Sequence, residues 1–238
     1  MTKILHRAED RGSADHGWLQ TNHNFSFASW YDPERTNFGA LRVLNDDFVA
    51  PGKGFGTHPH DNMEIISIPL AGKLEHRDDM GNGGVISEGE IQIMSAGTGI
   101  HHSEFNPSPA EMVNFLQIWI FPRIRNIEPR YDQVKYSRSA LQNNIITLIS
   151  PDLSDETLWI NQNAFVSLSK PENGKRITYK KKLAENGVYI FIISGRADID
   201  GESLQDRDAI GITGPEELKI HAVTDSFLLL IEVPVKGF

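Results

Sequence analysis

The chain has 238 residues, about one large domain or two small ones, and its composition of 39% hydrophobic and 23% charged residues excludes a collagen, a coiled coil or a chain disordered throughout. A formal charge of −9 at pH 7 disfavours nucleic acid as a partner, because phosphates need a basic surface. Cysteine is absent, which excludes thiol nucleophiles, thiolate metal sites and disulfides.

The sequence also bears on where the protein works. No apolar run reaches the roughly 18–20 residues that span a bilayer, and the first twelve residues lack the apolar segment of a signal peptide. We therefore expect a cytoplasmic protein with no membrane partner, acting as a monomer. Basic residues gather at 175–182, where we favour a lysine-protected strand edge over a site for an anionic partner.

Short runs of β-branched or alternating residues, separated by Gly, Asn, Asp and Pro, dominate the chain. Helical periodicity is weak throughout. In chain order, the predicted strands cover residues 63–70, 72–78, 90–96, 113–121, 145–150, 163–169, 187–194, 196–201 and 225–233. Many short strands at this spacing are typical of sandwiches and barrels.

A faint internal repeat divides this pattern into two halves. An apolar strand, a glycine turn and a polar strand occur around Gly72 and again around Gly195. An acidic turn and an apolar strand follow at 89–97 and 207–215, and a closing apolar strand at 115–120 and 227–233. We therefore predict an all-β protein of two stacked β-barrels, one over residues 1–132 and one over 133–238.

Eight of the nine histidines lie in residues 1–102, and two close groups stand out: His58-Pro59-His60 and His101-His102-Ser103-Glu104. Residues i and i+2 of a strand point to the same face. His58 with His60, and His102 with Glu104, therefore form two pairs that can converge on one ion if their strands face each other. Three imidazole nitrogens and one carboxylate suit Fe(II), Mn, Co, Ni, Cu or Zn better than Mg or Ca.

The alternative is a polar barrel lining without metal, and a closed structural zinc site is a further possibility. The parity of the strand points His101 away from His102, so His101 is not expected to be a ligand. His76, after GKLE, is expected to be a strand residue, and four other histidines have no partner by spacing: His6, His16, His23 and His221. Because His221 is the only histidine after residue 102, we expect one metal per chain, held by residues 58–104.

At these residues the sequence resembles a family. Gly52-x5-His58-x-His60-x3-Glu64 resembles the first cupin motif, and the segment from Gly89 to Asn106 resembles the second. Four longer segments are similar to the pirin family: GWLQTNHNFSFASWYDP (17–33), FGALRVLNDD (38–47), GFGTHPHDNMEI (54–65) and MSAGTGIHHSEFNP (94–107). The resemblance is dense over residues 7–122 and looser to the C-terminus.

The resemblance implies a bicupin of the jelly-roll type with one metal, usually Fe(II), in the N-terminal barrel. It carries the ligand role onto His58, His60, His102 and Glu104, the residues that strand parity also selects. Glu64, a ligand in other cupins, is expected to support the barrel wall or orient a ligand histidine. Bacterial pirins include quercetin 2,3-dioxygenases, which implies a flavonol-like aromatic substrate and O2, with carbon monoxide and a depside ester as products.

Two functions from different classes follow. In a dioxygenase, the metal would acidify a substrate hydroxyl, and Glu104 could accept its proton if it loosens from the metal, which makes Glu104 the candidate catalytic residue. In an iron-binding regulatory protein of the pirin type, iron oxidation would change a surface that binds a protein partner. The aromatic residues of 18–38 are expected to be core, whereas Gly54, Phe55 and Met63 are candidates for the wall of a substrate cleft.

Overall fold

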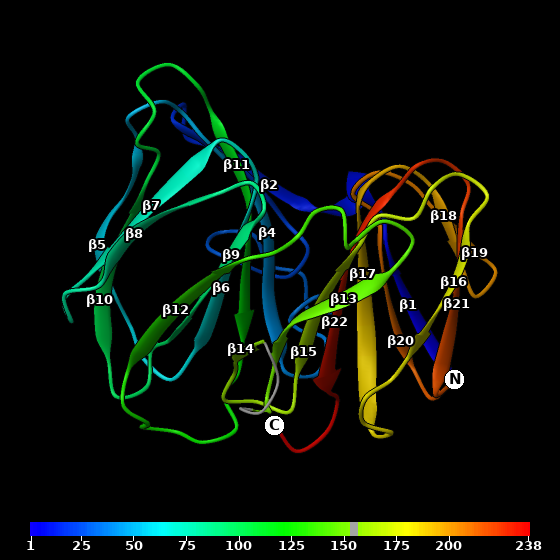
Figure 1. The fold of residues 1–238 in the computed structure, drawn as a ribbon. Coiled ribbons are helices and arrows are strands. Elements are labelled where there is room, and N and C mark those ends of the chain that lie inside the picture. The colour runs from blue at the N-terminus through cyan, green and yellow to red at the C-terminus, as the bar shows by residue number, and fades with distance from the viewer. Residues whose placement is uncertain (153–156) are drawn as a thin grey trace. The chain divides into compact units, whose positions relative to one another are not determined.

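The computed structural model describes residues 1–152 and 157–238 (Figure 1). In these two ranges the regular structure is strand apart from one short 3-10 helix, η1 (Ala8–Asp10), which confirms the all-β prediction. None of the helical structure described is long or apolar enough to cross a membrane.

The contacts divide the chain into two compact units. The N-terminal unit comprises Gly12–Tyr136 and Ile160–Gln162, and the C-terminal unit comprises Met1–Arg11, Ser137–Trp159 and Asn163–Phe238. This differs from the expected division after residue 132: residues 133–136 and 160–162 lie in the N-terminal unit, and residues 1–11 lie in the C-terminal unit. The reason at the N-terminus is backbone pairing, because the first strand, β1 (Thr2–His6), pairs with β20 (Ala209–Thr213) along its whole length.

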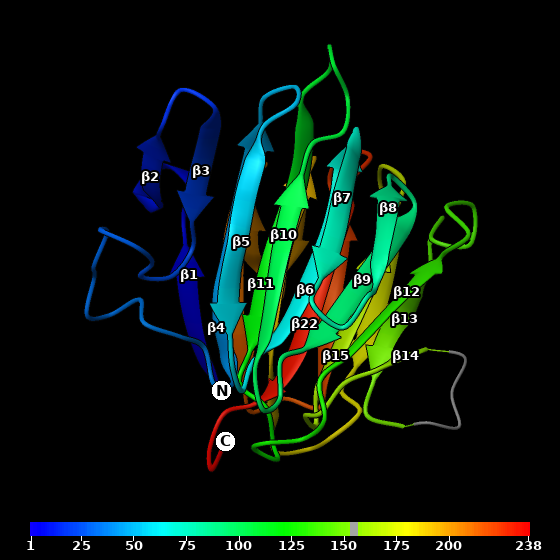
Figure 2. The same ribbon diagram turned by 90° about the vertical axis from the view of Figure 1, so that its left-hand side faces the viewer.

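The N-terminal unit contains a large and a small antiparallel sheet. The order of the small sheet is β5 (Gly54–His60), β10 (Ile100–Phe105), β7 (Lys73–Asp78) and β8 (Gly83–Ser87), and these strands lie side by side in Figure 2. The order of the large sheet is β12 (Arg130–Lys135), β9 (Glu90–Ser95), β6 (Glu64–Ala71), β11 (Val113–Ile120), β4 (Leu41–Val49), β3 (Leu19–His23) and β2 (Gly12–Asp15).

The C-terminal unit repeats this plan. Its large sheet has the order β1, β20, β17 (Asn186–Ser194), β22 (Phe227–Pro234), β15 (Phe165–Ser169), β13 (Ile145–Ser150) and β14 (Leu158–Trp159). The order of its small sheet is β16 (Arg176–Lys180), β21 (Glu217–Ala222), β18 (Ala197–Ile199) and β19 (Glu202–Leu204). Because β16 is an edge strand, Arg176 and Lys180 of the basic cluster lie at a strand edge, whereas Lys181 is buried.

The internal repeat of the sequence corresponds to this shared plan. The matching segments around Gly72 and Gly195 form the turns β6–β7 and β17–β18, and both glycines have positive φ. The closing strands β11 and β22 occupy the same place in the two large sheets. One topology has therefore been built twice, with β1 and β12 as the corresponding edge strands.

The interior of the N-terminal unit is apolar at one level and polar at another. A buried cluster of apolar side chains forms one part of the core: Leu19, Val49, Leu74, Ile86, Val113 and Phe115. Further along the same strands the buried side chains become polar, with Asn45, Ser67, Gln92 and Gln117 on the large sheet and His76, His102 and Glu104 on the small sheet. Burying so many polar groups costs free energy unless they are paired, which marks this level as the candidate site.

Candidate metal centre

Three histidines come together on two neighbouring strands of the small sheet. His58 and His60 lie on the edge strand β5, and His102 lies on β10 directly opposite His58. The ring centroids form a near-equilateral triangle with sides of 4.5, 4.8 and 4.9 Å. The expectation that the two pairs lie on facing strands is therefore wrong in its geometry: the strands are hydrogen-bonded neighbours, and the pairs meet through their register.

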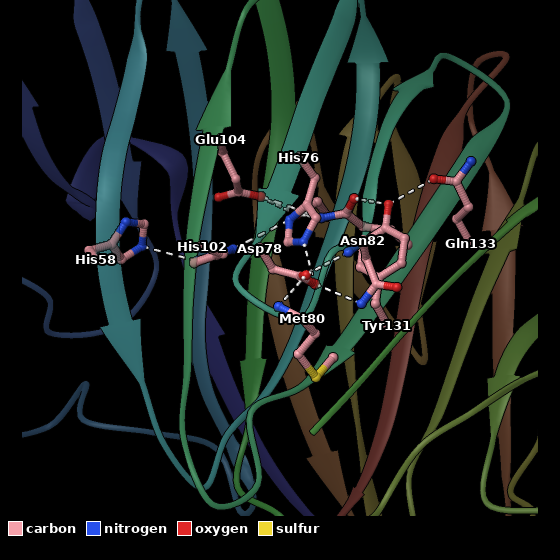
Figure 3. A network of polar contacts seen from close by, with 11 residues as sticks. His58, His76, Asp78, Met80, Asn82, His102, Glu104, Tyr131 and Gln133 are labelled. Carbon is pink, nitrogen blue, oxygen red and sulfur yellow. Dashed lines mark hydrogen bonds and ion pairs between the residues drawn. The ribbon is translucent and has the colours of Figure 1, made fainter. Parts of the chain in front are cut away.

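Two of the ring nitrogens face each other. Nε2 of His58 is 3.1 Å from Nε2 of His102 (Figure 3). The other nitrogen of His58, Nδ1, is 2.8 Å from the carbonyl oxygen of Gly56, which can only accept a hydrogen bond, so Nδ1 carries the proton. Nε2 of His58 is then a bare lone pair directed at His102, and only a proton or a cation between the nitrogens would make this contact favourable.

The histidines are held in the form that binds metals. Burial, with His58 nearby, lowers the pKa of His60 to about 4. Burial and the three neighbouring histidines lower the pKa of His102 far below its usual range. Both rings are therefore neutral at physiological pH, and neutral imidazole is the metal-ligating form. The donor set fits a transition metal ion.

Glu104 lies two residues beyond His102 on β10, after a shift in the pairing with β5. Its carboxyl is buried and accepts hydrogen bonds from Ser67 (3.0 Å) and Gln117 (2.7 Å) and a longer one from Gln92 (3.5 Å), all on the large sheet. Burial raises the pKa of Glu104 to about 7, although the bonds from Ser67 and Gln117 oppose the shift. Glu104 is therefore a buried carboxyl whose hydrogen bonds only partly offset the cost of its burial, and a carboxylate of this kind suits a transition metal ion together with histidine nitrogens.

The four predicted ligands fall into two overlapping groups. Ligand atoms of His58, His60 and His102 all lie within 4.8 Å of one another, and so do those of His76, His102 and Glu104. His102 belongs to both groups. His76, which sequence spacing left without a partner, is therefore brought to the site by the pairing of β7 with β10, where it lies opposite Glu104.

The remaining sequence candidates lie outside the cluster. His101 is exposed, and its Nδ1 is 3.2 Å from Asp79, so the parity argument places it correctly. Glu64 is buried and accepts hydrogen bonds from Ser95 (2.8 Å) and from the backbone of Asn161 (3.2 Å), and burial raises its pKa to about 7. These partners make Glu64 a support of the barrel wall and not an orienter of a ligand histidine.

A cavity of about 520 Å³ opens beside the histidines, and His58, His60 and Glu104 are part of its wall. Its volume lies within the roughly 300–1,000 Å³ of small-molecule pockets. Five further lining side chains are large and aromatic: Trp18, Phe27, Trp30, Phe55 and Trp119. The site therefore combines a candidate metal centre with a largely apolar chamber.

The aromatic segment is not simply core. Phe25 and Phe38 are buried as expected, but Trp18, Phe27 and Trp30 line the cavity and Tyr31 is 73% exposed. Most of the segment lies between β3 and β4 and outside the named strands, so a strand pattern cannot predict which of its side chains face the cavity.

Among the cleft candidates, only Phe55 borders the cavity. Met63 packs against the Ile65 and Met94 cluster. Gly54 lies against β10, where a Cβ would come within 2.2 Å of the carbonyl oxygen of Glu104, so the glycine allows the close approach of the two strands.

Asp47 is a further cavity residue that sequence reasoning missed. Its side chain is buried in β4, and burial together with the charges of Glu104 and Asp46 raises its pKa to about 7, against a hydrogen bond from Thr21. The signal was present in Asn45-Asp46-Asp47, three consecutive polar residues in the middle of a strand with apolar residues on both sides.

The C-terminal unit fills the corresponding positions with apolar side chains. His76 is four residues after Gly72, and Ile199 is four residues after Gly195, so these two positions correspond. His76 lies opposite Glu104, and Ile199 lies opposite Ile220, so Ile220 takes the place of Glu104. Leu218, two residues before Ile220 on β21, takes the place of His102. Tyr179, which lies opposite Leu218, takes the place of His58. All four belong to one buried cluster. Within residues 1–152 and 157–238, the groups of three or more close donors lie in the N-terminal unit.

Known proteins match both halves of the chain. Residues 5–120 match the family model for pirin, and residues 147–233 match the model for the quercetinase C-terminal cupin domain. Quercetin 2,3-dioxygenase of Escherichia coli K12 is 43% identical over 233 residues, covering 97% of this chain and 98% of that protein. A pirin-like protein of Caulobacter vibrioides is 39% identical, covering 93% and 95%.

Solved structures match along the whole chain. The crystal structure of YhhW from Escherichia coli is 40% identical and superposes with a TM-score of 0.94, covering 100% of both chains. A structure of the bacterial pirin YhhW in complex with nickel(II) gives a TM-score of 0.92 at 41% identity, covering 98% of this chain and 99% of that one. The cupin fold predicted from the sequence is confirmed, and this chain belongs to the pirin family.

Proposed function

We propose that this protein is a metal-dependent dioxygenase that cleaves flavonols such as quercetin with O2. The observation that carries the proposal is the shared wall: His58, His60 and Glu104 line the same 520 Å³ cavity as five aromatic side chains. A flat aromatic substrate bound there would be held against the candidate metal ligands. The relatives named quercetin 2,3-dioxygenase support the same activity.

His58, His60, His102 and Glu104 would hold one divalent metal ion. We favour Fe(II), and the nickel(II) complex of YhhW supports a site that also takes other divalent ions. The bound ion would supply Lewis-acid polarisation of the substrate and the electron-transfer chemistry that reaction with O2 requires. The protein supplies position, exclusion of water and proton transfer.

The aromatic walls provide the position. Trp18 and Phe55 meet edge to face with their ring centroids 5.3 Å apart, and Phe27 and Trp119 do the same at 5.4 Å. Trp119 also lies edge to face with His60, at 5.0 Å. These paired rings form two stiff surfaces that bury a planar aromatic ligand without ordering long flexible side chains.

Glu104 is the group best placed to accept a proton from a substrate hydroxyl. In the metal-free protein its pKa is about 7, and in the loaded enzyme Glu104 would first have to loosen from the ion before it could act as the general base. Ser67 lies 3.0 Å both from Glu104 and from Oε1 of Gln117, and its hydroxyl has one proton to donate. Ser67 can therefore turn toward Gln117 when Glu104 becomes protonated.

The test is metal analysis of protein purified without an affinity tag, combined with O2 uptake and carbon monoxide release in the presence of quercetin. Iron or another transition metal with stoichiometric O2 uptake and carbon monoxide supports the proposal. Redox-active iron without turnover supports the regulatory alternative, and tightly held, inert zinc supports a structural site. His101→Ala is the matched control, because it changes an exposed histidine beside the site and should keep full activity.

A further inference from the structure

A buried chain of polar groups continues outward from the candidate ligand His102. Nδ1 of His102 is 3.4 Å from Nδ1 of His76, and Nε2 of His76 is 3.4 Å from Oδ2 of Asp78 (Figure 3). The side chains of His76 and Asp78 are completely buried. These contacts link Nδ1 of His102 to a carboxylate at the end of the neighbouring strand β7.

At the Asp78 end of this chain, the direction of the hydrogen bond is fixed, because Asp78 can only accept. The carboxylate of Asp78 accepts hydrogen bonds from the backbone N–H groups of Met80 (3.1 Å) and Asn82 (2.8 Å) and from the Asn82 side chain (2.9 Å). These bonds hold it in the tight turn between β7 and β8. A carboxylate only accepts, so the nitrogen of His76 that faces it must be the protonated one.

The hydrogen bond to Asp78 then determines which nitrogen carries the proton in each of the two histidine rings. In a neutral His76 with its proton on Nε2, Nδ1 is an acceptor, and the facing Nδ1 of His102 must be the donor. His102 is left with an unprotonated Nε2, the atom that faces His58. At 3.4 Å both bonds are weak, and without a metal the shorter 3.1 Å contact with the lone pair of His58 favours a proton on Nε2 of His102. The chain from Asp78 therefore sets this tautomer once a cation lies between His58 and His102.

The ring of His76 is also held in place by packing. Tyr131 on β12 stacks on it with the ring centroids 4.5 Å apart and the planes 20° from parallel. The hydroxyl of Tyr131 lies 2.7 Å from Oε1 of Gln133 and 3.0 Å from Oε1 of Gln92, and donating its one proton to either of them anchors the stack on the large sheet. His76 can neither rotate toward solvent nor turn its ring over without breaking these contacts.

We propose that His76 is a positioning residue that, with Asp78, fixes His102 in the tautomer whose Nε2 binds the metal. Groups that hydrogen-bond the second nitrogen of a ligating histidine fix its orientation and raise its basicity, and their loss weakens metal binding by roughly 10–100-fold. The carbonyl of Gly56 does the same for His58. The proposal rests on the assignment of His102 as a ligand in the proposed function.

The experiment measures zinc affinity by competition with a chelator, together with the ring nitrogen NMR signals of histidine in the zinc-loaded protein. We expect His76→Phe, which keeps a ring against Tyr131 but has no ring nitrogen, to bind zinc roughly 10–100-fold more weakly. His76→Gln can still accept from His102 and donate to Asp78, so it should recover most of the loss. His101→Phe, the control on the exposed neighbour, should bind zinc normally.

The NMR measurement reads the tautomers directly. We expect a proton on Nε2 of His76 and on Nδ1 of His102 in the wild type, a result that a purely structural role would not require. Wild-type zinc affinity in His76→Phe, or a proton on Nδ1 of His76, overturns the proposal. If His76→Phe does not fold, the tautomers of the wild type and the zinc affinity of His76→Gln test the proposal instead. Normal zinc affinity in His102→Ala would instead show that the ligand assignment is wrong.

Discussion

The Nε2 atoms of His58 and His102 lie 3.1 Å apart across one antiparallel pair of strands, and the Gly56 carbonyl directs the lone pair of His58 into that gap. The backbone register of β5 and β10 therefore creates a site that attracts a proton or a cation. The first two predictions below concern the metal ion that this gap would hold.

His58→Ala and His102→Ala should each abolish metal retention without unfolding the protein. The protein should stay folded because the apolar cluster around Leu74 and Phe115 does not include the histidines. Metal content and thermal unfolding of both variants provide the measurement, with His101→Ala as a control that keeps its metal. Loss of the cooperative unfolding transition together with the metal would show that the ion is structural.

Metal affinity should depend on pH through Glu104. Below its pKa of about 7 a proton competes with the metal for the carboxylate, whereas His60, with a pKa of about 4, is already neutral. The logarithm of the nickel association constant should rise by about one per pH unit between about pH 5 and 7 and then level off. Glu104→Gln should bind nickel weakly with no such rise, and an unchanged slope in that variant would assign the proton to another group.

The same carboxyl should destabilise the metal-free protein at neutral pH. The pKa of Glu104 is about 7 when folded and 4.5 in the reference state, so the folded protein binds the extra proton between these values and loses stability as the pH rises. Metal-free Glu104→Gln should therefore be more stable than wild type above pH 7, by on the order of 3 kcal/mol.

The difference between these two proteins should vanish below about pH 4.5, where Glu104 is protonated in both states. Urea unfolding of the metal-free proteins at several pH values measures this difference in the free energy of unfolding. A difference that does not change with pH would mean that Glu104 keeps one protonation state when buried.

The cavity wall should govern substrate binding and not metal binding. Trp18→Ala removes a ring from the wall, and burial of an aromatic side chain contributes about 1.5–3 kcal/mol, so KM for quercetin should rise roughly 10–100-fold. Tyr31→Ala, in the same segment but 73% exposed, should leave KM unchanged. Steady-state kinetics and nickel affinity of both variants test this, and weaker nickel binding by Trp18→Ala would contradict it.

Much of the candidate site could be predicted because strand parity is local. The two-residue alternation places His58, His60, His102 and Glu104 on one face and His101 on the other, and the structure shows this arrangement. The faint repeat likewise corresponds to two sheets of matching order. In both cases the relevant residues are close in sequence or follow a repeated pattern.

The parts that sequence reasoning missed depend on register between distant segments. His76 reaches the site only because β7 pairs with β10 so that His76 lies opposite Glu104. Trp119 belongs to a strand that reads as core, and its role in the cavity depends on where the aromatic segment docks. The pairing of β1 with β20 joins residues about two hundred positions apart, which no local pattern in the chain signals.

The most direct measurement is an anaerobic equilibrium titration of the metal-free protein with Fe(II). One ion per chain should bind, and the combined variant His58→Ala, His102→Ala should bind none, because the corresponding positions of the C-terminal unit are Tyr179 and Leu218 in an apolar cluster. A stoichiometry near two, or one ion that still binds to the double variant, would contradict a single metal site on β5 and β10.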